Sequence, residues 1–272
     1  MLNKLKGIVK SAILLAKRLK FHLLFKSKPK AGEYCNSKLI YLYRQPTQGT
    51  KNRPYLAIIR CGVNHSLIDD CGNRNFDIAL NPFASPNTLC LEHYEYLYAG
   101  GMNKYKAAYQ FLNDSISNKY KGFIFLDDDV EITYSHLNDF LEYCSVHGFR
   151  LAQPSLSHDS FFSHRHLVNA SKRGWRFVRT VEVMCPYFSN GALNIAIRTF
   201  DLSYSTWGLD IAWSRLFDFD PVVVDEFTIK HTQPTDSSGA FYRYMRRIGV
   251  SPQQESKRLR GISVEKLRKL TI

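Results

Sequence analysis

Three consecutive carboxylates, Asp127, Asp128 and Asp129, directly follow the apolar run from Phe123 to Leu126. Carboxylates packed so closely repel one another unless a cation or hydrogen bonds hold them. Hard divalent cations such as Mn²⁺ and Mg²⁺ bind one or two protein carboxylates and complete their shell with substrate phosphates. The triplet therefore predicts a metal site for a phosphorylated substrate, but an acidic turn that caps the following helix is an open alternative.

A histidine far downstream, His231, follows the apolar run from Val222 to Val224 and precedes Pro234. Imidazole is a frequent metal ligand, yet a lone histidine is far more often an ordinary side chain. We expect His231 to be a ligand only if the acidic triplet holds a metal with an unfilled coordination position.

Another carboxylate, Asp210, begins a helical segment just after Trp207 and Gly208. Transfer of a sugar to an acceptor hydroxyl needs a base within hydrogen-bonding reach, and an indole ring offers an apolar face to a sugar. Asp210 is a candidate for that base and Trp207 for acceptor contact, with Glu182 as a further acceptor candidate. Equally, Asp210 could cap a helix and Trp207 could be a core residue.

The segment from Phe161 to Arg179, with the residues just before it, is rich in basic and aromatic side chains. Such a segment could hold an anionic acceptor or shield a site from water. Zinc binding there lacks the Cys or Glu partners that would make it specific. The basic residues considered are His158, His164, Arg165, His166, Lys172, Arg173 and Arg176.

Short apolar runs alternate with helical patterns along the middle of the chain. Apolar runs bounded by turn formers predict buried strands, and apolar spacings of three and four residues predict helices. The alternation indicates an α/β fold with a mostly parallel central sheet and helices on both faces. In such sheets ligands bind beyond the carboxyl ends of the strands. The predicted strands are 55–60, 76–80, 123–126, 151–155, 181–184 and 222–224, and the predicted helices are 105–112, 136–147 and 211–217.

The net charge of +13 is concentrated at the two ends of the chain. Residues 1–30 contribute +9 and residues 242–272 contribute +7, which leaves −3 for the remainder. A slightly acidic core with basic ends favours contact with anionic lipid or phosphates over a nucleic-acid-binding face, and the sequence carries no nucleic-acid-binding motif.

The six cysteines are scattered without a disulfide or zinc spacing, which favours reduced thiols in a cytosol.

The first thirty residues alternate apolar and basic side chains. Their longest uncharged run, 11–16, is far shorter than the roughly 20 residues of a membrane span, and no secretory cleavage site is recognisable. The pattern predicts an amphipathic helix that lies on the anionic inner face of a membrane. A helix packed on the domain and a transit peptide are open alternatives. We divide the chain into a basic segment with its linker over 1–50, a catalytic domain over 51–240 and a basic C-terminal tail over 241–272.

The chain resembles the GT-A glycosyltransferases over roughly residues 55–235. The resemblance rests on the order of the elements: strand, polar loop, strand, helix, a strand that ends in the acidic triplet, the run 207–210, and then His231. More narrowly, the runs 151–154, 181–189 and 207–210 are similar to a largely uncharacterised GT-A-like family found in plants and bacteria.

The resemblance implies a metal, usually Mn²⁺, that bridges the aspartates and the diphosphate of a nucleotide-sugar donor. Its implied ligands in this sequence are Asp127, Asp129 and His231. By the same resemblance, the nucleotide base would be bordered by Arg60, Asn64 and Asp77. Asp128 or Asp127 would contact the ribose, and Lys104 would approach the ribose or diphosphate. The residues implied to make these nucleotide-sugar contacts are Arg60, Asn64, Asp77, Lys104, Asp127 and Asp128.

The resulting prediction is a metal-dependent, inverting glycosyltransferase that moves a sugar to a hydroxyl of a glycan or glycolipid at the inner membrane surface. Asp210 matches the acidic residue of a Trp-Gly-x-x-Asp-like acceptor motif, although the spacing is shorter here. One alternative is a nucleotidyltransferase, which typically has a Gly-rich phosphate loop after its first strand, unlike the segment from Cys61 to Asn64. The other is a non-catalytic membrane-surface adaptor, because fold does not fix function.

Overall fold

The structure is a computed structural model that describes residues 40–44, 53–62, 65–83, 94–99, 103–112, 114–171, 174–235 and 239–270. The predictions made for the basic segment 1–30, Asn64, Lys172 and Arg173 lie outside these residues. Within the described ranges, no helix is both long enough and apolar enough to span a bilayer.

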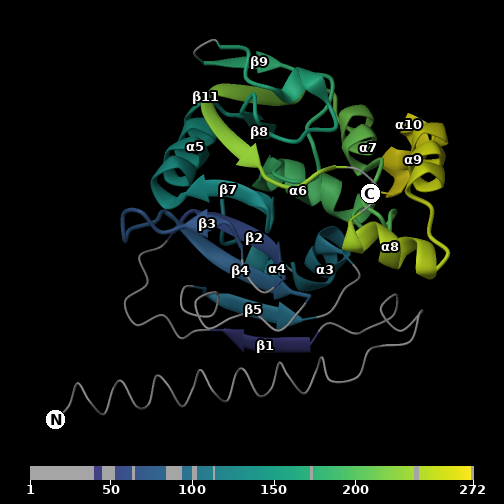
Figure 1. The fold of residues 1–272 in the computed structure, drawn as a ribbon, viewed down its shortest axis with the longest axis horizontal. Helices are drawn as coiled ribbons and strands as arrows, with labels where there is room; N and C mark the ends of the chain where they lie inside the picture. Colours follow the sequence, from purple (N-terminus) through teal and green to yellow (C-terminus); the bar gives the residue numbers. More distant parts are fainter. Residues whose placement is uncertain are drawn as a thin grey trace.

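A sheet of eleven strands forms the centre of the described part of the chain (Figure 1). The order across it is β1 (Ile40–Arg44), β5 (Tyr96–Ala99), β4 (Phe76–Pro82), β2 (Tyr55–Cys61), β6 (Gly122–Asp127), β10 (Tyr187–Ser189), β8 (Leu151–Leu156), β11 (Val222–His231), β7 (Val130–Thr133) and β3 (Leu67–Ile68), with β9 (Trp175–Phe177) paired to β11. Strands β5, β4, β2 and β6 are parallel neighbours, and β8 is parallel to β11.

The prediction of a mostly parallel sheet is wrong, because five of the ten pairings among the described strands are antiparallel. At the centre of the sheet, β10 runs antiparallel to both β6 and β8. The predicted strand 181–184 is instead a loop whose apolar residues Val181 and Met184 are buried. The chain then turns at Pro186 and returns as β10. Burial of a loop against the end of β6 thus produces the same apolar pattern as a buried strand.

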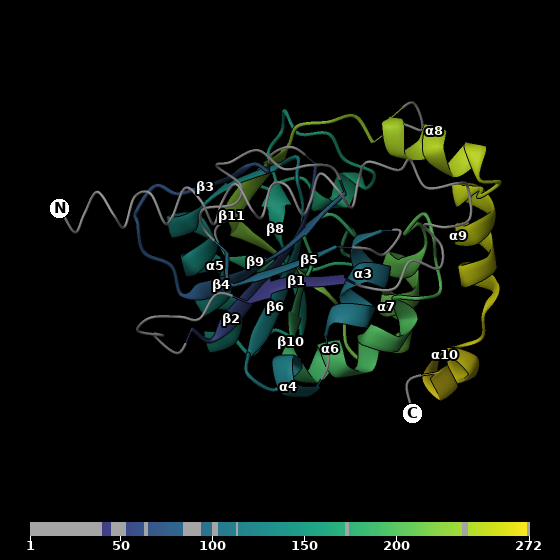
Figure 2. The ribbon, with the colours of Figure 1, turned by 90° about the horizontal axis from the view of Figure 1, so that it is seen from below.

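Helices cover both faces of the sheet, as predicted, with α5 (Tyr134–Val146) on one face and α3, α6 and α7 on the other (Figure 2). Adjacent residues of β10 show the two faces, since successive side chains of a strand point to opposite sides. Tyr187 packs on Phe140 of α5 with ring centroids 6.2 Å apart, whereas Phe188 packs on Trp213 of α7 at 5.1 Å.

The bounds of these and the remaining helical elements before the C-terminal helices are α3 (Lys104–Phe111), α4 (Asp114–Ser117), α6 (Asn190–Ala196), α7 (Leu209–Leu216) and the 3₁₀ turns η2 (Arg165–Leu167) and η3 (Ile197–Thr199).

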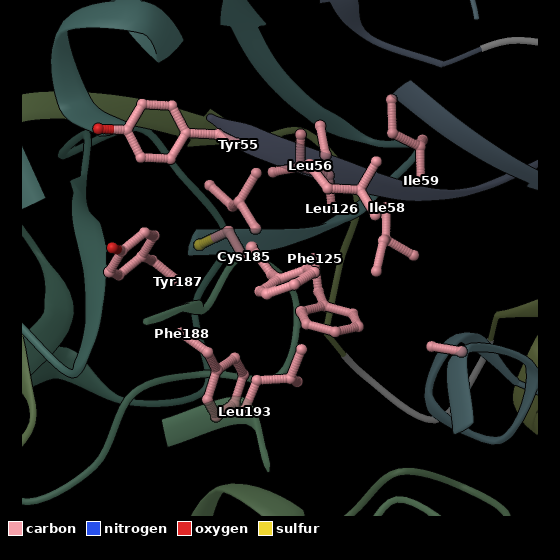
Figure 3. Packing of buried hydrophobic residues seen from close by; sticks show 14 of the residues in the cluster. Tyr55, Leu56, Ile58, Ile59, Phe125, Leu126, Cys185, Tyr187, Phe188 and Leu193 are labelled. Carbon is pink, nitrogen blue, oxygen red and sulfur yellow. The ribbon is translucent and has the colours of Figure 1, made fainter. Parts of the chain in front are cut away.

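The core lies where β2 and β6 meet these helices (Figure 3). Leu56, Ile58 and Phe125 are fully buried, in keeping with the near-continuous apolar character of strands that are covered on both faces. The hydroxyl of Tyr55, at the start of β2, reaches α5 and donates to a Glu142 carboxylate oxygen at 2.9 Å. A rigid core thus fixes the carboxyl ends of β2 and β6.

The long strand β11 changes partners along its length. Val222 to Val224 pair with β8 and β9; after an irregularity between Val224 and Thr228 the strand pairs again with β8, and its last two residues pair with β7. There His231 pairs with Val130, and Thr232 N donates to the Asp129 carbonyl at 3.0 Å. This change of partners brings the end of β11 back to the end of β6.

Three C-terminal helices, α8 (Ala240–Arg247), α9 (Pro252–Gly261) and α10 (Val264–Leu270), lie beside α7 on one side of the molecule (Figures 1 and 2). Gly208, with a φ of +88°, allows the close packing: a Cβ there would lie 2.9 Å from the Ser256 backbone. Buried Glu255 accepts hydrogen bonds from the backbone of Tyr204 and Ser205. The helices are therefore fixed to the domain at the start of α7.

Candidate functional site

A cavity of about 1540 Å³ opens beyond the carboxyl ends of β2 and β6. Its walls come from the ends of these strands, the loop 182–184, the start of α7, the end of β11 and the helices α8 and α9. This is the edge where ligands bind in sheets with parallel strands. The predicted site residues that line this cavity are Arg60, Lys104, Asp127, Asp128, Asp129, Glu182, Trp207, Asp210 and His231.

Asp77 does not reach the cavity, contrary to the prediction that it borders the nucleotide base. It is the second residue of β4 and therefore lies near the amino end of the strand, away from the cavity. Its two carboxylate oxygens accept hydrogen bonds from Arg53 at 3.0 Å and from the Tyr120 hydroxyl at 2.7 Å. Asp77 thus belongs to a structural network.

Asp127, the last residue of β6, is held in place by a buried lysine. Lys104 Nζ lies 3.0 Å from Asp127 Oδ1 and donates to the carbonyls of Val183 at 2.8 Å and Met184 at 3.1 Å. An ammonium group has three donors, and these three contacts use them all. Lys104 therefore fastens the loop 182–184 to the end of β6, and the prediction that it donates to the ribose or diphosphate is not supported.

Asp128 faces the loop that follows β2. Its Oδ2 accepts a hydrogen bond of 2.7 Å from Gly62 N, and its carbonyl accepts one of 2.8 Å from the Ser66 hydroxyl. Burial raises the pKa of Asp128 to about 6, and repulsion from Asp127 and Asp129 adds to that rise. The Asp128 carboxylate thus fixes the shape of the loop at the end of β2.

Asp129 and His231 meet across the turn between β6 and β7, with Asp129 Oδ1 3.2 Å from His231 Nε2. Asp129 Oδ1 is buried, and besides His231 Nε2 it has no partner among the described residues. His231 Nδ1 lies 3.2 Å from the Phe161 carbonyl, so a proton on Nδ1 would leave the Nε2 lone pair directed at Asp129. Two electron-pair donors at this distance require a proton or a cation between them.

The pair fits a divalent metal. A metal-ligating histidine usually donates its other N–H to a carbonyl or carboxylate, and Phe161 supplies that carbonyl here. Two ligands at right angles, each about 2.1 Å from one ion, would lie about 3 Å apart. Among the residues that the structure describes, no three His, Cys, Asp or Glu side chains cluster as metal ligands. Asp129 and His231 are therefore the fitting protein ligands, whereas one oxygen of Asp127 is engaged by Lys104.

Asp210 lies in the first turn of α7 and is almost fully buried, with 8% of its surface exposed. Its Oδ2 lies 3.1 Å from His164 Nε2. This hydrogen bond to Asp210 raises the pKa of His164, although burial of the imidazole acts in the opposite direction. The alternative that Asp210 caps the helix is not observed, because Gly208 occupies the cap position.

Glu182 is a second buried carboxylate on the same wall, with 5% of its surface exposed. Oε1 accepts a hydrogen bond of 2.9 Å from Ser163 N, but Oε2 has no partner among the described residues. Burial raises the pKa of Glu182. A carboxyl group with one unpartnered oxygen at a cavity wall is suited to contact a ligand hydroxyl.

Aromatic side chains lie at the other parts of the wall. Trp207 is half-buried, and its indole Nε1 donates to the Tyr242 hydroxyl of α8 at 2.9 Å. Near the end of β2, the Arg60 guanidinium donates to Asn81 Oδ1 and lies 5.6 Å from the ring centroid of Phe83. The cavity thus has an Arg60 and Phe83 end and a Trp207 and Tyr242 end.

The sequence did not reveal that His164 contacts Asp210, or that the helices α8 and α9 form one wall of the cavity. Of the described residues in the basic segment, His164 lines the cavity, whereas Arg176 forms an ion pair with Asp225 at 2.8 Å. Helices α8 and α9 contribute several lining residues, although their sequence indicated only a basic tail. The available signal was the helical spacing of Gln253, Ser256, Lys257 and Arg260, which places them on one face of α9.

The sequence matches no protein-family model and no curated protein. The solved structures similar to this chain include those of TarS and GalNAc-T7. TarS of S. aureus has a TM-score of 0.46 and 12% identity, over 74% of this chain and 41% of TarS. TarS 1-349 in complex with UDP-GlcNAc has a TM-score of 0.46 and 12% identity, over 78% of this chain and 71% of the fragment.

GalNAc-T7 with UDP, GalNAc and Mn²⁺ has a TM-score of 0.46 and 9% identity, over 79% of this chain and 54% of that protein. The chain spans less than half the length of the full TarS chain. Likenesses of this size establish neither family membership nor activity for this chain.

Proposed function

We propose that the chain is a metal-dependent glycosyltransferase of the GT-A type. It transfers a sugar from a nucleotide-diphosphate sugar to a hydroxyl of a glycan or glycolipid acceptor. The observation that carries the proposal is that one cavity holds both the Asp129–His231 pair and the buried Asp210–His164 pair. Transfer of a sugar needs a place for the diphosphate and a base for the acceptor, and these two pairs supply them.

Asp129 and His231 hold the metal, Mn²⁺ or Mg²⁺, which when bound neutralises charge on the departing diphosphate. The end of β2, with Arg60 and Phe83, forms the wall for the nucleotide. Asp128 and Lys104 contribute by fixing the loops on either side of β6. Their substitution should therefore disturb donor binding through the shape of the cavity.

Asp210 takes the proton of the attacking acceptor hydroxyl. His164 keeps the Asp210 carboxylate oriented through their hydrogen bond. Trp207 and Glu182 contact the acceptor sugar, Trp207 through its ring face and Glu182 through the unpartnered Oε2. A single displacement by a hydroxyl attacking opposite the leaving group inverts the anomeric configuration.

The place of action belongs to the proposal as well. The basic, amphipathic sequence of residues 1–30 is suited to the anionic inner surface of a membrane, where glycolipid acceptors are exposed to the cytoplasm.

A thermal-shift screen of nucleotide-diphosphate sugars with and without Mn²⁺ tests the proposal. A ligand that binds the native state at about 100 times its Kd adds about 2.7 kcal/mol of stability. We expect one nucleotide class to raise Tm in the presence of Mn²⁺, and EDTA to abolish the rise. Asp129→Asn should abolish it too, whereas Asp218→Asn, which alters an exposed carboxylate outside the cavity, should not.

Metal-dependent hydrolysis of the bound donor then separates an enzyme from a silent adaptor. We expect slow release of free sugar in the absence of acceptor. If no nucleotide sugar binds in a metal-dependent manner, the proposed function is wrong. Donor binding without any hydrolysis or transfer would favour the adaptor.

A further inference from the structure

The α9 wall of the cavity carries positive charge close to the proposed base. Lys257 and Arg260 of α9 and Arg247 of α8 all line the cavity. Lys257 and Arg260 are three residues apart, and with Gln253 and Ser256 they form one face of α9. The face is thus a continuous helical surface directed at the cavity.

These cations differ from the other charged groups of the cavity in their partners. Asp127 pairs with Lys104, Asp129 with His231 and Asp210 with His164. In contrast, no carboxylate of the described residues forms an ion pair with Lys257, Arg260 or Arg247. Arg247 instead lies 5.4 Å from the ring centroid of Tyr244. Within the described part of the protein, the cations on this wall therefore have no carboxylate in direct contact.

The position of α9 places this charge on the acceptor side. Ser256 and Leu259 pack directly on Gly208, two residues before Asp210. Arg260 is also close enough to His164 for its charge to oppose protonation of that imidazole. The α9 face therefore adjoins the Asp210–His164 pair that the proposed function assigns to the acceptor.

The cavity has room for a donor and an acceptor together. Its volume of about 1540 Å³ exceeds the 300–1,000 Å³ of pockets that hold one drug-sized ligand. With the nucleotide at the β2 end, the remaining space lies between Asp210 and α9. A cavity wall with unpaired cations attracts anions, and guanidinium groups bind phosphate and carboxylate through paired hydrogen bonds.

We propose that Lys257 and Arg260, with Arg247, bind a phosphate or carboxylate group of the acceptor, so that the acceptor is an acidic glycan. This inference rests on the proposed function, because only a glycosyltransferase has an acceptor. Binding of an anion to these residues can nevertheless be measured without donor or metal. The basic face of α9 selects the acceptor by its charge. Asp210 takes the proton of the hydroxyl that reacts, and Glu182 contacts the acceptor sugar.

The test uses small probes in place of the unidentified glycan. Glycerol 3-phosphate and glucuronate carry the two anionic groups, and glycerol and glucose are their neutral counterparts. Binding to the full chain is measured by ligand-observed NMR in the presence of EDTA, so that no metal contributes. We expect the anionic probes to bind and the neutral ones not to bind.

Substitution locates the binding on α9. The double variant Lys257→Gln/Arg260→Gln should weaken anion binding by about tenfold or more, equivalent to about 1.4 kcal/mol. The matched control Lys121→Gln/Lys269→Gln removes two exposed positive charges away from the cavity and should leave binding unchanged. Both double variants should keep the metal-dependent Tm rise with nucleotide sugar, which separates this inference from the proposed function.

Two results would overturn the inference. One is that the anionic probes fail to bind the unmodified chain, or bind the Lys257→Gln/Arg260→Gln variant equally well. The other is that this variant loses binding to phosphatidylglycerol vesicles while glycerol 3-phosphate binds neither protein, which would make the α9 face a membrane contact.

Discussion

The two ends of the central parallel strands carry similar charged residues but use them differently. At the amino ends of β2 and β4, Arg53 and Arg74 pair with Asp77 and Glu95. All four carboxylate oxygens there have partners: Arg53, Arg74, the Tyr120 hydroxyl and the backbone N–H of Ile78. At the carboxyl ends, Asp129 Oδ1 lies 3.2 Å from His231 Nε2, whereas Glu182 Oε2 has no hydrogen-bond partner among the described residues.

This difference shows what distinguishes a structural charge network from a binding site. A buried polar atom without a partner costs about 1–3 kcal/mol, so such atoms concentrate where a ligand supplies the missing partner. Residue type alone does not separate the two ends, because both contain carboxylates and basic groups. Both oxygens of Asp77 and of Glu95 have partners, whereas Glu182 at the cavity keeps one carboxylate oxygen without a partner.

The largest expected effect is at the carboxyl end. Asp210→Asn removes the proposed base and should lower turnover about 10²–10⁴-fold, with nucleotide-sugar binding in Mn²⁺ retained because the proposed metal ligands Asp129 and His231 are untouched. Steady-state transfer rates and the Tm rise with donor measure the two quantities. A variant with normal transfer rates would remove Asp210 from the mechanism.

At the amino end, substitution should affect stability and not catalysis. Glu95→Gln breaks two ion pairs of a nearly buried carboxylate, and loss of one partner from such a network costs about 3–5 kcal/mol. Urea unfolding should show this loss of unfolding free energy. We expect a value near the lower end of that range, because Arg53 is partly exposed and water screens its charge. Turnover per folded molecule should be unchanged, and a selective loss of turnover would contradict the division between the two ends.

A smaller effect is expected where α9 meets the start of α7. Gly208→Ala introduces a Cβ at a φ of +88° and 2.9 Å from the Ser256 backbone, which should cost about 1–3 kcal/mol. Because α9 must shift to make room for the methyl group, both the stability and the affinity for anions should decrease. Gly191→Ala is the control, since its Cβ would meet nothing within 4 Å. Equal stability of the two variants would show that the helices do not pack as described.

The smallest effect concerns pH. Asp210 raises the pKa of His164, while Glu182 adds to the rise and Arg260 opposes it. The stabilisation from a raised pKa is fully present below the ordinary pKa of His and is lost as pH rises through the folded-state pKa. The destabilisation caused by Asp210→Asn should therefore be larger at pH 5.5 than at pH 8.5. NMR titration should show a lower His164 pKa in the variant, and an unchanged pKa would mean that the pair does not form.

The sequence predicts the elements with clear periodicity or clear boundaries. The strands β2, β4 and β6 and the helix α5 lie where apolar runs and turn formers place them. The strand β10 could not be predicted, because three residues after Pro186 carry too little periodicity to be separated from the buried loop before them. The antiparallel pairings that lie between β6 and β8 at the centre of the sheet depend on that short strand.

For the site, position along a strand was the informative feature. Asp127 ends β6 and lies at the cavity, whereas Asp77 is only the second residue of β4 and lies at the opposite edge. The contact between His164 and Asp210 joins residues 46 positions apart, so no local pattern reveals it. Lys104 could not be recognised as a structural lysine, because its partners belong to a loop about eighty residues away.

The placement of α8 to α10 after every strand of the sheet has a consequence for how such a protein could diversify. The residues proposed to bind the charged group of an acceptor form one uninterrupted stretch, separate in sequence from the strands that carry the aspartates. Under the proposed function, exchange of that stretch between related chains would change the charge preference for the acceptor while the donor preference persists, provided that Glu255 and Leu259 are retained to anchor the transplanted helices.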